Sequence, residues 1–211
     1  QMLTECGIEY LGFPLRLPVN KEDISEEEAE NIIANFPPQA KGVLITYLNM
    51  STEIITLTER IGVKIIQLHG HVSLTELSKL RTLKSNYHII KSLIVGKHSR
   101  SDLIETIKEV SEFVDAFIID SYNPRTGATG ATGIVHDWQV SKDLVESSAK
   151  PIILAGGLTP DNVYDAILKV GPSGVDVHTG VEDNMGRKNR KKVIKFVKEA
   201  KRAFRKLEIT Q

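Results

Sequence analysis

Two glycine-containing segments in the last third of the chain carry the strongest chemical signal. Residues 154–158 (Leu-Ala-Gly-Gly-Leu) and 175–182 (Val-Asp-Val-His-Thr-Gly-Val-Glu) each end an apolar run and open a turn. Glycine lets the backbone approach an anion closely, and free N–H groups near a helix start attract negative charge. We therefore predict a phosphate-binding site formed by Gly156, Gly157, Thr179 and Gly180. The alternative is that these glycines only form tight strand-to-helix turns.

A carboxyl group ends another apolar run. Asp120 follows Ile118 and Ile119, and it precedes a stretch rich in glycine and threonine at residues 126–133. Partial burial of a carboxyl raises its pKa, which suits proton donation. We predict that Asp120 is a catalytic acid and that the stretch after it is an active-site flap. The alternative for Asp120 is a cap on the following turn.

Two further side chains are weaker candidates. His69 ends the apolar run 64–68, where it is either an acid–base group or a hydrogen-bonded structural residue. Lys91 lies in the run 88–94, and a Schiff-base role for it is conceivable. No carboxylate has the spacing that would complete a metal site with His69 and His71, so no metal is expected.

The elements that position these residues follow a regular order. Short, nearly continuous apolar runs alternate with amphipathic stretches, as in parallel strands connected by helices. The seven runs are residues 10–13, 42–48, 64–68, 88–94, 116–120, 151–154 and 174–177. Because the glycine signals follow the last two strands, we predict a (β/α)8 barrel rather than an open doubly wound sheet. Eight strands are needed, so we expect residues 1–211 to form a single barrel domain that lacks strand 1 at its N-terminus.

The helices have recognisable start signals. Ser25 with Glu28, and Ser73 with Glu76, match the capping-box pattern. Thr159 followed by Pro160 predicts an N-cap and a first helical residue. Two other helices are expected to be capped by Ser51 and Ser101. The last helix is predicted at about residues 189–207, with an apolar stripe at Val193, Val197, Ala200, Phe204 and Leu207.

The composition gives no sign of a nucleic-acid-binding, membrane-bound or disulfide-stabilised protein. Lys plus Arg and Asp plus Glu both number 27, which gives no support for a nucleic-acid or membrane-surface partner. The one cysteine, Cys6, excludes an intramolecular disulfide, and no apolar run approaches the ~20 residues of a membrane span. We expect a cytoplasmic protein that acts on a phosphorylated small molecule as a monomer or homodimer.

Several motifs resemble phosphoribosylanthranilate isomerase over nearly the whole chain and in the same order. They are Leu11-Gly12-Phe13, Gln67–Gly70, Ile119-Asp120, Gly130–Gly133 with His136-Asp137-Trp138, Ala155–Val163 and Val175–Glu182. The resemblance implies a (β/α)8 barrel and a cofactor-free Amadori rearrangement of an aminoaldose phosphate to an aminoketose phosphate. It implies that Asp120 is the general acid and that the backbone around Gly156-Gly157 and Thr179-Gly180 holds the phosphate. As candidate substrate contacts we predict Arg16, His69, Gly133, Asp176 and His178.

The departures from the family pattern lie on the substrate side. The family's general base is a cysteine on strand 1, whereas Cys6 lies in the region that matches helix 1. Arg16 is displaced from the usual arginine position, the flap lacks its second glycine, and His178 replaces a serine. Two alternative functions therefore stay open: an enzyme for another sugar phosphate, and a non-catalytic protein that binds a phosphorylated metabolite.

Overall fold

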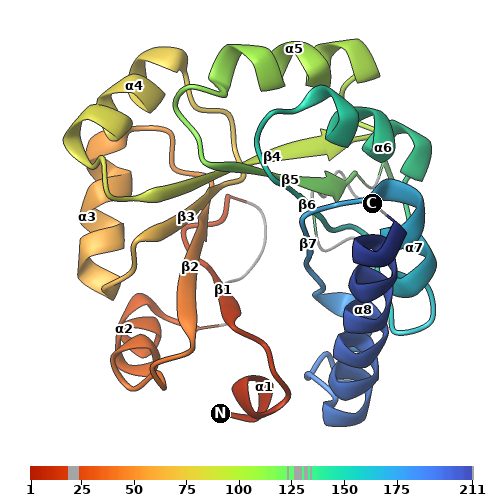
Figure 1. Ribbon diagram of the computed structural model, residues 1–211. Coiled ribbons are helices and arrows are strands. Elements are labelled where there is room, and N and C mark those ends of the chain that lie inside the picture. The colour runs from red at the N-terminus through yellow and green to blue at the C-terminus, as the bar shows by residue number, and fades with distance from the viewer. Residues whose placement is uncertain (19–23, 123, 126–129, 131–132, 134, 211) are drawn as a thin grey trace. The chain divides into compact units, whose positions relative to one another are not determined.

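The computed structural model describes residues 1–18, 24–122, 124–125, 130, 133 and 135–210. Within these residues helices and strands alternate along the chain (Figure 1). The strands are β1 (Tyr10–Pro14), β2 (Lys41–Thr46), β3 (Ile65–Leu68), β4 (His88–Val95), β5 (Ala116–Ser121), β6 (Ile152–Leu154) and β7 (Gly174–Val175). The helices are α1 (Met2–Glu5), α2 (Glu26–Ala34), α3 (Ser51–Ile61), α4 (Leu74–Leu83), α5 (Arg100–Val110), α6 (Trp138–Ser147), α7 (Val163–Val170), the 3-10 helix η1 (Thr179–Val181) and α8 (Arg190–Thr210).

The strands are hydrogen-bonded in chain order, and neighbouring strands run parallel wherever a register is defined. This confirms the predicted parallel sheet and the positions of all seven strands to within two residues. The seven strands found in the described part of the chain are one fewer than the eight of a closed barrel. The sheet begins with β1, which follows α1, as expected for a barrel without its first strand.

Two compact units share these elements. One contains residues 8–92 and 109–116, and the other contains residues 1–7, 93–108 and 117–211. The core of the first includes the fully buried strand residues Leu44, Ile66 and Ile89. The core of the second includes Phe117, Ile119 and Leu154, and its helices α7 and α8 lie side by side (Figure 1). The expectation of one continuous domain stays a prediction.

The helix starts confirm one capping box, confirm Ser73 as the cap of α4 without a full box, and correct the other predicted caps. The Ser25 hydroxyl accepts from the Glu28 backbone, and the Glu28 carboxylate accepts from the Ser25 backbone. The second box is only half formed, because Glu76 turns away from Ser73 to accept from the backbone and hydroxyl of Ser51. Ser51 is therefore the first residue of α3 and not its cap.

Two other predicted caps are displaced along the chain. The cap of α5 is Ser99 rather than Ser101, because the Ser99 hydroxyl accepts from the Asp102 backbone. Helix α7 begins at Val163, since Thr159 and Pro160 belong to a preceding turn that is closed by Asn162.

Helix α8 agrees with the predicted last helix but extends to Thr210. Its most buried residues are Val193, Phe196, Ala200 and Ala203, so the core-facing stripe is rotated from the predicted one. Among the described residues, no helix is both long and apolar enough to cross a membrane.

Candidate active site

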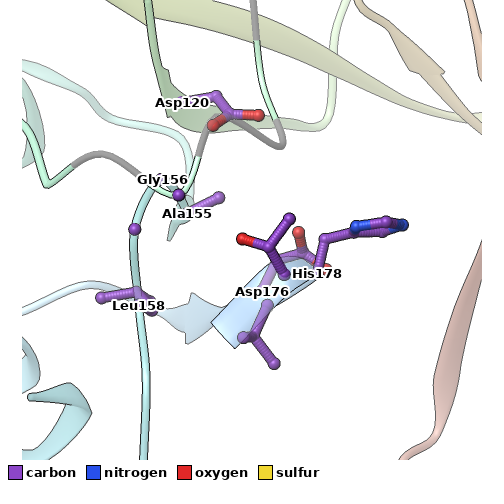
Figure 2. A pocket seen from close by; sticks show the side chains of 10 residues that line it. Asp120, Ala155, Gly156, Leu158, Asp176 and His178 are labelled. Carbon is purple, nitrogen blue, oxygen red and sulfur yellow. The ribbon is translucent and has the colours of Figure 1, made fainter. Parts of the chain in front are cut away.

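A pocket lies where three loops follow strands of the same unit. Its lining comprises Asp120, Gly133, Ala155, Gly156, Gly157, Leu158, Asp176, Val177, His178 and Thr179. Figure 2 shows Asp120 across the pocket from Asp176 and His178, with the Ala155–Leu158 segment beside them. The structure thus brings together seven of the ten site residues predicted from the sequence.

Backbone hydrogen bonds hold the strand ends that carry this pocket. The Ala155 N–H donates to the Ile119 carbonyl at 2.8 Å, and the Asp176 N–H donates to the Leu154 carbonyl at 2.9 Å. Immediately beyond these bonds, Gly156 and Gly157 adopt left-handed φ values of 81° and 67°. Other residue types rarely adopt two successive positive φ values, so the turn depends on its glycines.

Gly180 allows the loops after β6 and β7 to touch. A Cβ atom placed on Gly180 would lie 1.9 Å from the Leu158 carbonyl oxygen, far inside van der Waals contact. No side chain fits there without a backbone shift. The close approach of Gly180 to Leu158 places η1, which begins at Thr179, directly beside the Gly156-Gly157 turn.

The N–H groups of these two loops are open to a ligand. Among the described residues, no hydrogen-bond acceptor contacts the backbone N–H groups of Gly156, Gly157, Thr179 or Gly180. The first N–H groups of any helix lack partners within the helix, which accounts for those of Thr179 and Gly180. Unpaired N–H groups from two adjacent loops form a concave site suited to an anion.

Asp120 has the properties of a proton donor. Its residue is only 8% exposed, and this burial raises the pKa of the carboxyl to about 7. The Ser121 N–H donates to Asp120 Oδ1 at 2.8 Å and opposes that rise, whereas the negative charge of Asp176 reinforces it. At neutral pH a large fraction of Asp120 therefore keeps its proton.

Asp176 and His178 form the side of the pocket that faces Asp120. The protein surrounding Asp176 raises the pKa of its carboxyl, although water still reaches the side chain and screens part of this effect. His178 Nδ1 lies 3.3 Å from Glu182 Oε1, and that carboxylate also accepts from Lys188 Nζ at 2.6 Å. Lys188 donates in addition to the His178 carbonyl oxygen.

Gly133 and His136 lie beside the glycine turns of the pocket. Gly133 lines the pocket with φ 67°, and a Cβ on it would lie 3.5 Å from the Thr179 hydroxyl. The rest of the predicted flap, apart from Gly130, lies outside the described residues. Behind Gly156, the His136 ring leaves no room for a side chain: a Cβ on Gly156 would be 2.9 Å from His136 Nδ1.

Two predicted substrate residues belong to the other unit. Arg16, with a φ of 54°, is paired through its guanidinium with Glu26. His69 is buried, its Nδ1 lies 3.0 Å from the Ser92 hydroxyl, and its ring packs against Tyr47. These contacts agree with the structural alternative for His69, and a substrate role for either residue stays a prediction.

Lys91 and Cys6 both lie outside the lining of this pocket and contact other residues of the protein. Burial lowers the pKa of Lys91 to about 8, and its ammonium donates to the carbonyl oxygens of Leu68, Gly70 and Ser92. Cys6 ends α1, a helix that contacts α8, and its thiol lies 3.9 Å from the Met2 sulfur.

The ion pair behind His178 and three apolar lining residues of the pocket were not predicted from the sequence. The Glu182–Lys188 pair behind His178 joins residues on either side of the turn before α8. Ala155, Leu158 and Val177 also line the pocket although they carry no chemically distinctive group. Glu182 ends one of the glycine segments, but only the folded turn shows that it reaches back to His178.

The family model and the curated relatives that match this chain belong to one family. A family model described as N-(5′-phosphoribosyl)anthranilate isomerase matches residues 4–199. The chain is 38% identical over 205 residues to N-(5′-phosphoribosyl)anthranilate isomerase 2 of Methanosarcina mazei, covering 96% of this chain and 89% of that protein.

Solved structures of such isomerases resemble this fold. The enzyme from Thermotoga maritima has a TM-score of 0.78 at 28% identity, covering 95% of this chain and 91% of that one. A phosphoribosylanthranilate isomerase bound to reduced 1-(o-carboxyphenylamino)-1-deoxyribulose 5-phosphate has a TM-score of 0.76 at 26% identity, with the same coverage.

Proposed function

Because the chain belongs to the N-(5′-phosphoribosyl)anthranilate isomerase family, we propose that it isomerises this substrate in tryptophan biosynthesis. The reaction converts an aminoaldose phosphate to an aminoketose phosphate without a cofactor. The observation that carries the proposal is that one pocket holds a buried carboxyl with its pKa raised to about 7 and two loops whose backbone amides have no acceptor among the described residues.

Asp120 begins the reaction as general acid. Its proton goes to the furanose ring oxygen as the bond between that oxygen and C1′ breaks, which yields the open-chain protonated imine. Loss of the C2′ proton to a base then gives an enolamine. A proton is finally added at C1′ while the 2′-hydroxyl loses its own, which leaves the ketone and balances the proton that Asp120 gave up. A pKa of about 7 matches proton donation at neutral pH, where a carboxyl with an ordinary pKa is almost fully ionised.

The phosphate end is held by the backbone. We assign it to the N–H groups of Gly156, Gly157, Thr179 and Gly180, which have no competing acceptor among the described residues. This anchoring fixes the ring oxygen relative to Asp120, because the reacting atoms and the phosphate belong to one small molecule.

The base of the second step is not assigned to Cys6. That thiol follows α1, ahead of β1, and contacts Met2, whereas the family's cysteine belongs to a barrel strand that is not among the seven strands of the described residues. We therefore expect Cys6→Ser to leave turnover unchanged.

Turnover of N-(5′-phosphoribosyl)anthranilate by the wild type and by Asp120→Asn tests the proposal. The loss of a positioned acid costs about 10²–10⁴-fold in kcat, while phosphate affinity stays within a factor of about two. Equal turnover by both proteins would show that Asp120 is not the acid.

We expect the active species to be a monomer or homodimer, which sedimentation in the assay buffer would establish.

A further inference from the structure

Asn162 stands at the start of α7, but its side chain does not cap that helix. Asparagine is among the best N-cap residues, because its side-chain oxygen can accept from an N–H of the first helical turn. Here Asn162 Oδ1 accepts from the Thr159 N–H at 2.8 Å, and Asn162 Nδ2 donates to the Gly157 carbonyl oxygen at 3.0 Å. The side chain therefore binds the loop after β6, part of which lines the phosphate pocket, rather than the helix that follows.

The bond from Asn162 Nδ2 fixes the direction of one peptide group in this loop. The peptide bonds of the described residues are trans, so the Gly157 carbonyl and the Leu158 N–H point in opposite directions. Gly157 and Leu158 line the pocket, whereas Asn162 does not. The Gly157 carbonyl oxygen is thus occupied by a side chain outside the lining, and the Leu158 N–H points away from that side chain.

The backbone of this turn holds its peptide groups only weakly by itself. Gly156 and Gly157 are consecutive glycines, and glycine adopts positive and negative φ values about equally readily. Rotation of the Gly157–Leu158 peptide group would exchange its N–H for its carbonyl on the side away from Asn162. Carbonyl and phosphate oxygens are both hydrogen-bond acceptors, so on a pocket-lining segment this exchange would replace an attraction by a repulsion.

We propose that Asn162 is a positioning residue of the phosphate site, which locks the Gly157–Leu158 peptide group so that the Gly157 carbonyl oxygen does not face the anion. The inference rests on the proposed function, because it concerns how the same pocket keeps its backbone suited to a phosphate. Asn162 acts through the loop and does not itself touch the ligand.

Calorimetric titration with inorganic phosphate compares the wild type with Asn162→Ser and Asn162→Ala. Both variants are neutral, so neither adds a charge near the anion. Serine also favours helix N-caps, but its hydroxyl is one bond shorter than the asparagine amide and cannot form both loop bonds. We expect both variants to bind phosphate at least about tenfold more weakly, the effect of losing one aligned hydrogen bond to a charged group. The Tm of Asn162→Ser is expected to stay within about 4 °C of the wild type.

Asn189→Ala is the matched control. Asn189 directly precedes α8 in the same unit, and its Oδ1 accepts from the Lys192 N–H at 3.2 Å. This substitution removes an asparagine bond at a helix start without touching the loop after β6. It is expected to lower Tm and to leave the affinity for phosphate within about twofold of the wild type.

Amide chemical shifts separate positioning from a general loosening of the fold. At saturating phosphate, the amide signals of Thr179 and Gly180 in Asn162→Ser are expected to shift as in the wild type. Among the described residues, their loop makes no hydrogen bond to Asn162.

Three results overturn the inference but leave the phosphate pocket standing: wild-type affinity in both Asn162 variants, an equal loss of affinity in Asn189→Ala, or lost responses at Thr179 and Gly180 in Asn162→Ser. Absence of phosphate binding by the wild type contradicts the pocket itself, and hence the proposed function as well.

Discussion

At the residue scale, the proposed reaction depends on Asp120, a carboxyl whose surroundings raise its pKa to about 7. Burial is the main cause of the raised pKa of Asp120, and the charge of Asp176 adds to it. A general acid acts only while it holds its proton. We therefore expect kcat/KM to fall above about pH 7, by roughly tenfold for each further pH unit.

The variant Asp176→Asn measures the effect of Asp176 on this fall of kcat/KM at alkaline pH. Removal of the negative charge lets Asp120 ionise more readily, so the alkaline limb of the pH–rate profile moves to lower pH. An alkaline limb that stays in place, or moves upward, would show that Asp176 does not influence the acid. Ser121, whose N–H contacts Asp120, is the same in both proteins and does not affect the comparison.

The place of several predicted site residues in one pocket could be expected from their positions in the sequence. Asp120 is the next-to-last residue of β5, and Gly156 and Asp176 lie within two residues of the ends of β6 and β7. Parallel strands bring such ends to one edge of the sheet. The role of Glu182 could not be predicted, because it depends on how the turn before α8 folds back. The rotated stripe of α8 has a similar origin: Phe196 and Ala203 are buried by contacts that periodicity alone does not specify.

At the element scale, the contact between the loops after β6 and β7 shapes the phosphate site. Gly180→Ala places a methyl group 1.9 Å from the Leu158 carbonyl oxygen unless the backbone moves. We expect phosphate affinity to fall at least about tenfold, as expected when several amides lose their alignment. Gly174→Ala is the control, since a Cβ there meets only Ile153 at 3.8 Å; titration of both variants with phosphate makes the comparison.

A second element-scale contact joins α4 to the start of α3. Glu76 accepts from Lys79 and from the backbone and hydroxyl of Ser51, and these bonds lower its pKa to about 2. A lowered pKa stabilises the fold above the ordinary pKa of 4.5, and the stabilisation is lost as pH falls toward 2. Glu76→Gln should thus lower Tm at pH 7 and have little effect near pH 2, whereas an equal shift at both pH values would contradict the role of the charge.

This contact also shows the limit of local sequence signals. The Ser73–Glu76 pattern is the same as that of Ser25 and Glu28, yet only the latter pair forms a full capping box. The Glu76 carboxylate has a better partner in Ser51, 25 residues away. Alternation of strands and helices was predictable from apolar runs, but such competition between local and distant partners was not.

At the scale of the whole molecule, the protonated Asp120 reduces stability at neutral pH. The folded carboxyl keeps its proton to about pH 7, while the unfolded one loses it near its ordinary pKa of 3.8. Between these values the native state binds more protons, so stability falls as pH rises. Asp120→Asn removes this loss and should stabilise the protein at pH 7.5 by up to about 4 kcal/mol, with little change at pH 4. Urea unfolding of both proteins at the two pH values measures the difference, and a variant less stable at pH 7.5 would contradict it.

The central claim is that backbone amides of two adjacent loops bind the phosphate group. Amide chemical shifts of the isotope-labelled protein, followed during titration with inorganic phosphate, test it most directly. The account predicts that the largest shifts occur at Gly156, Gly157, Thr179 and Gly180 and saturate together. Saturating shifts confined to other residues, with these four unmoved, would contradict it.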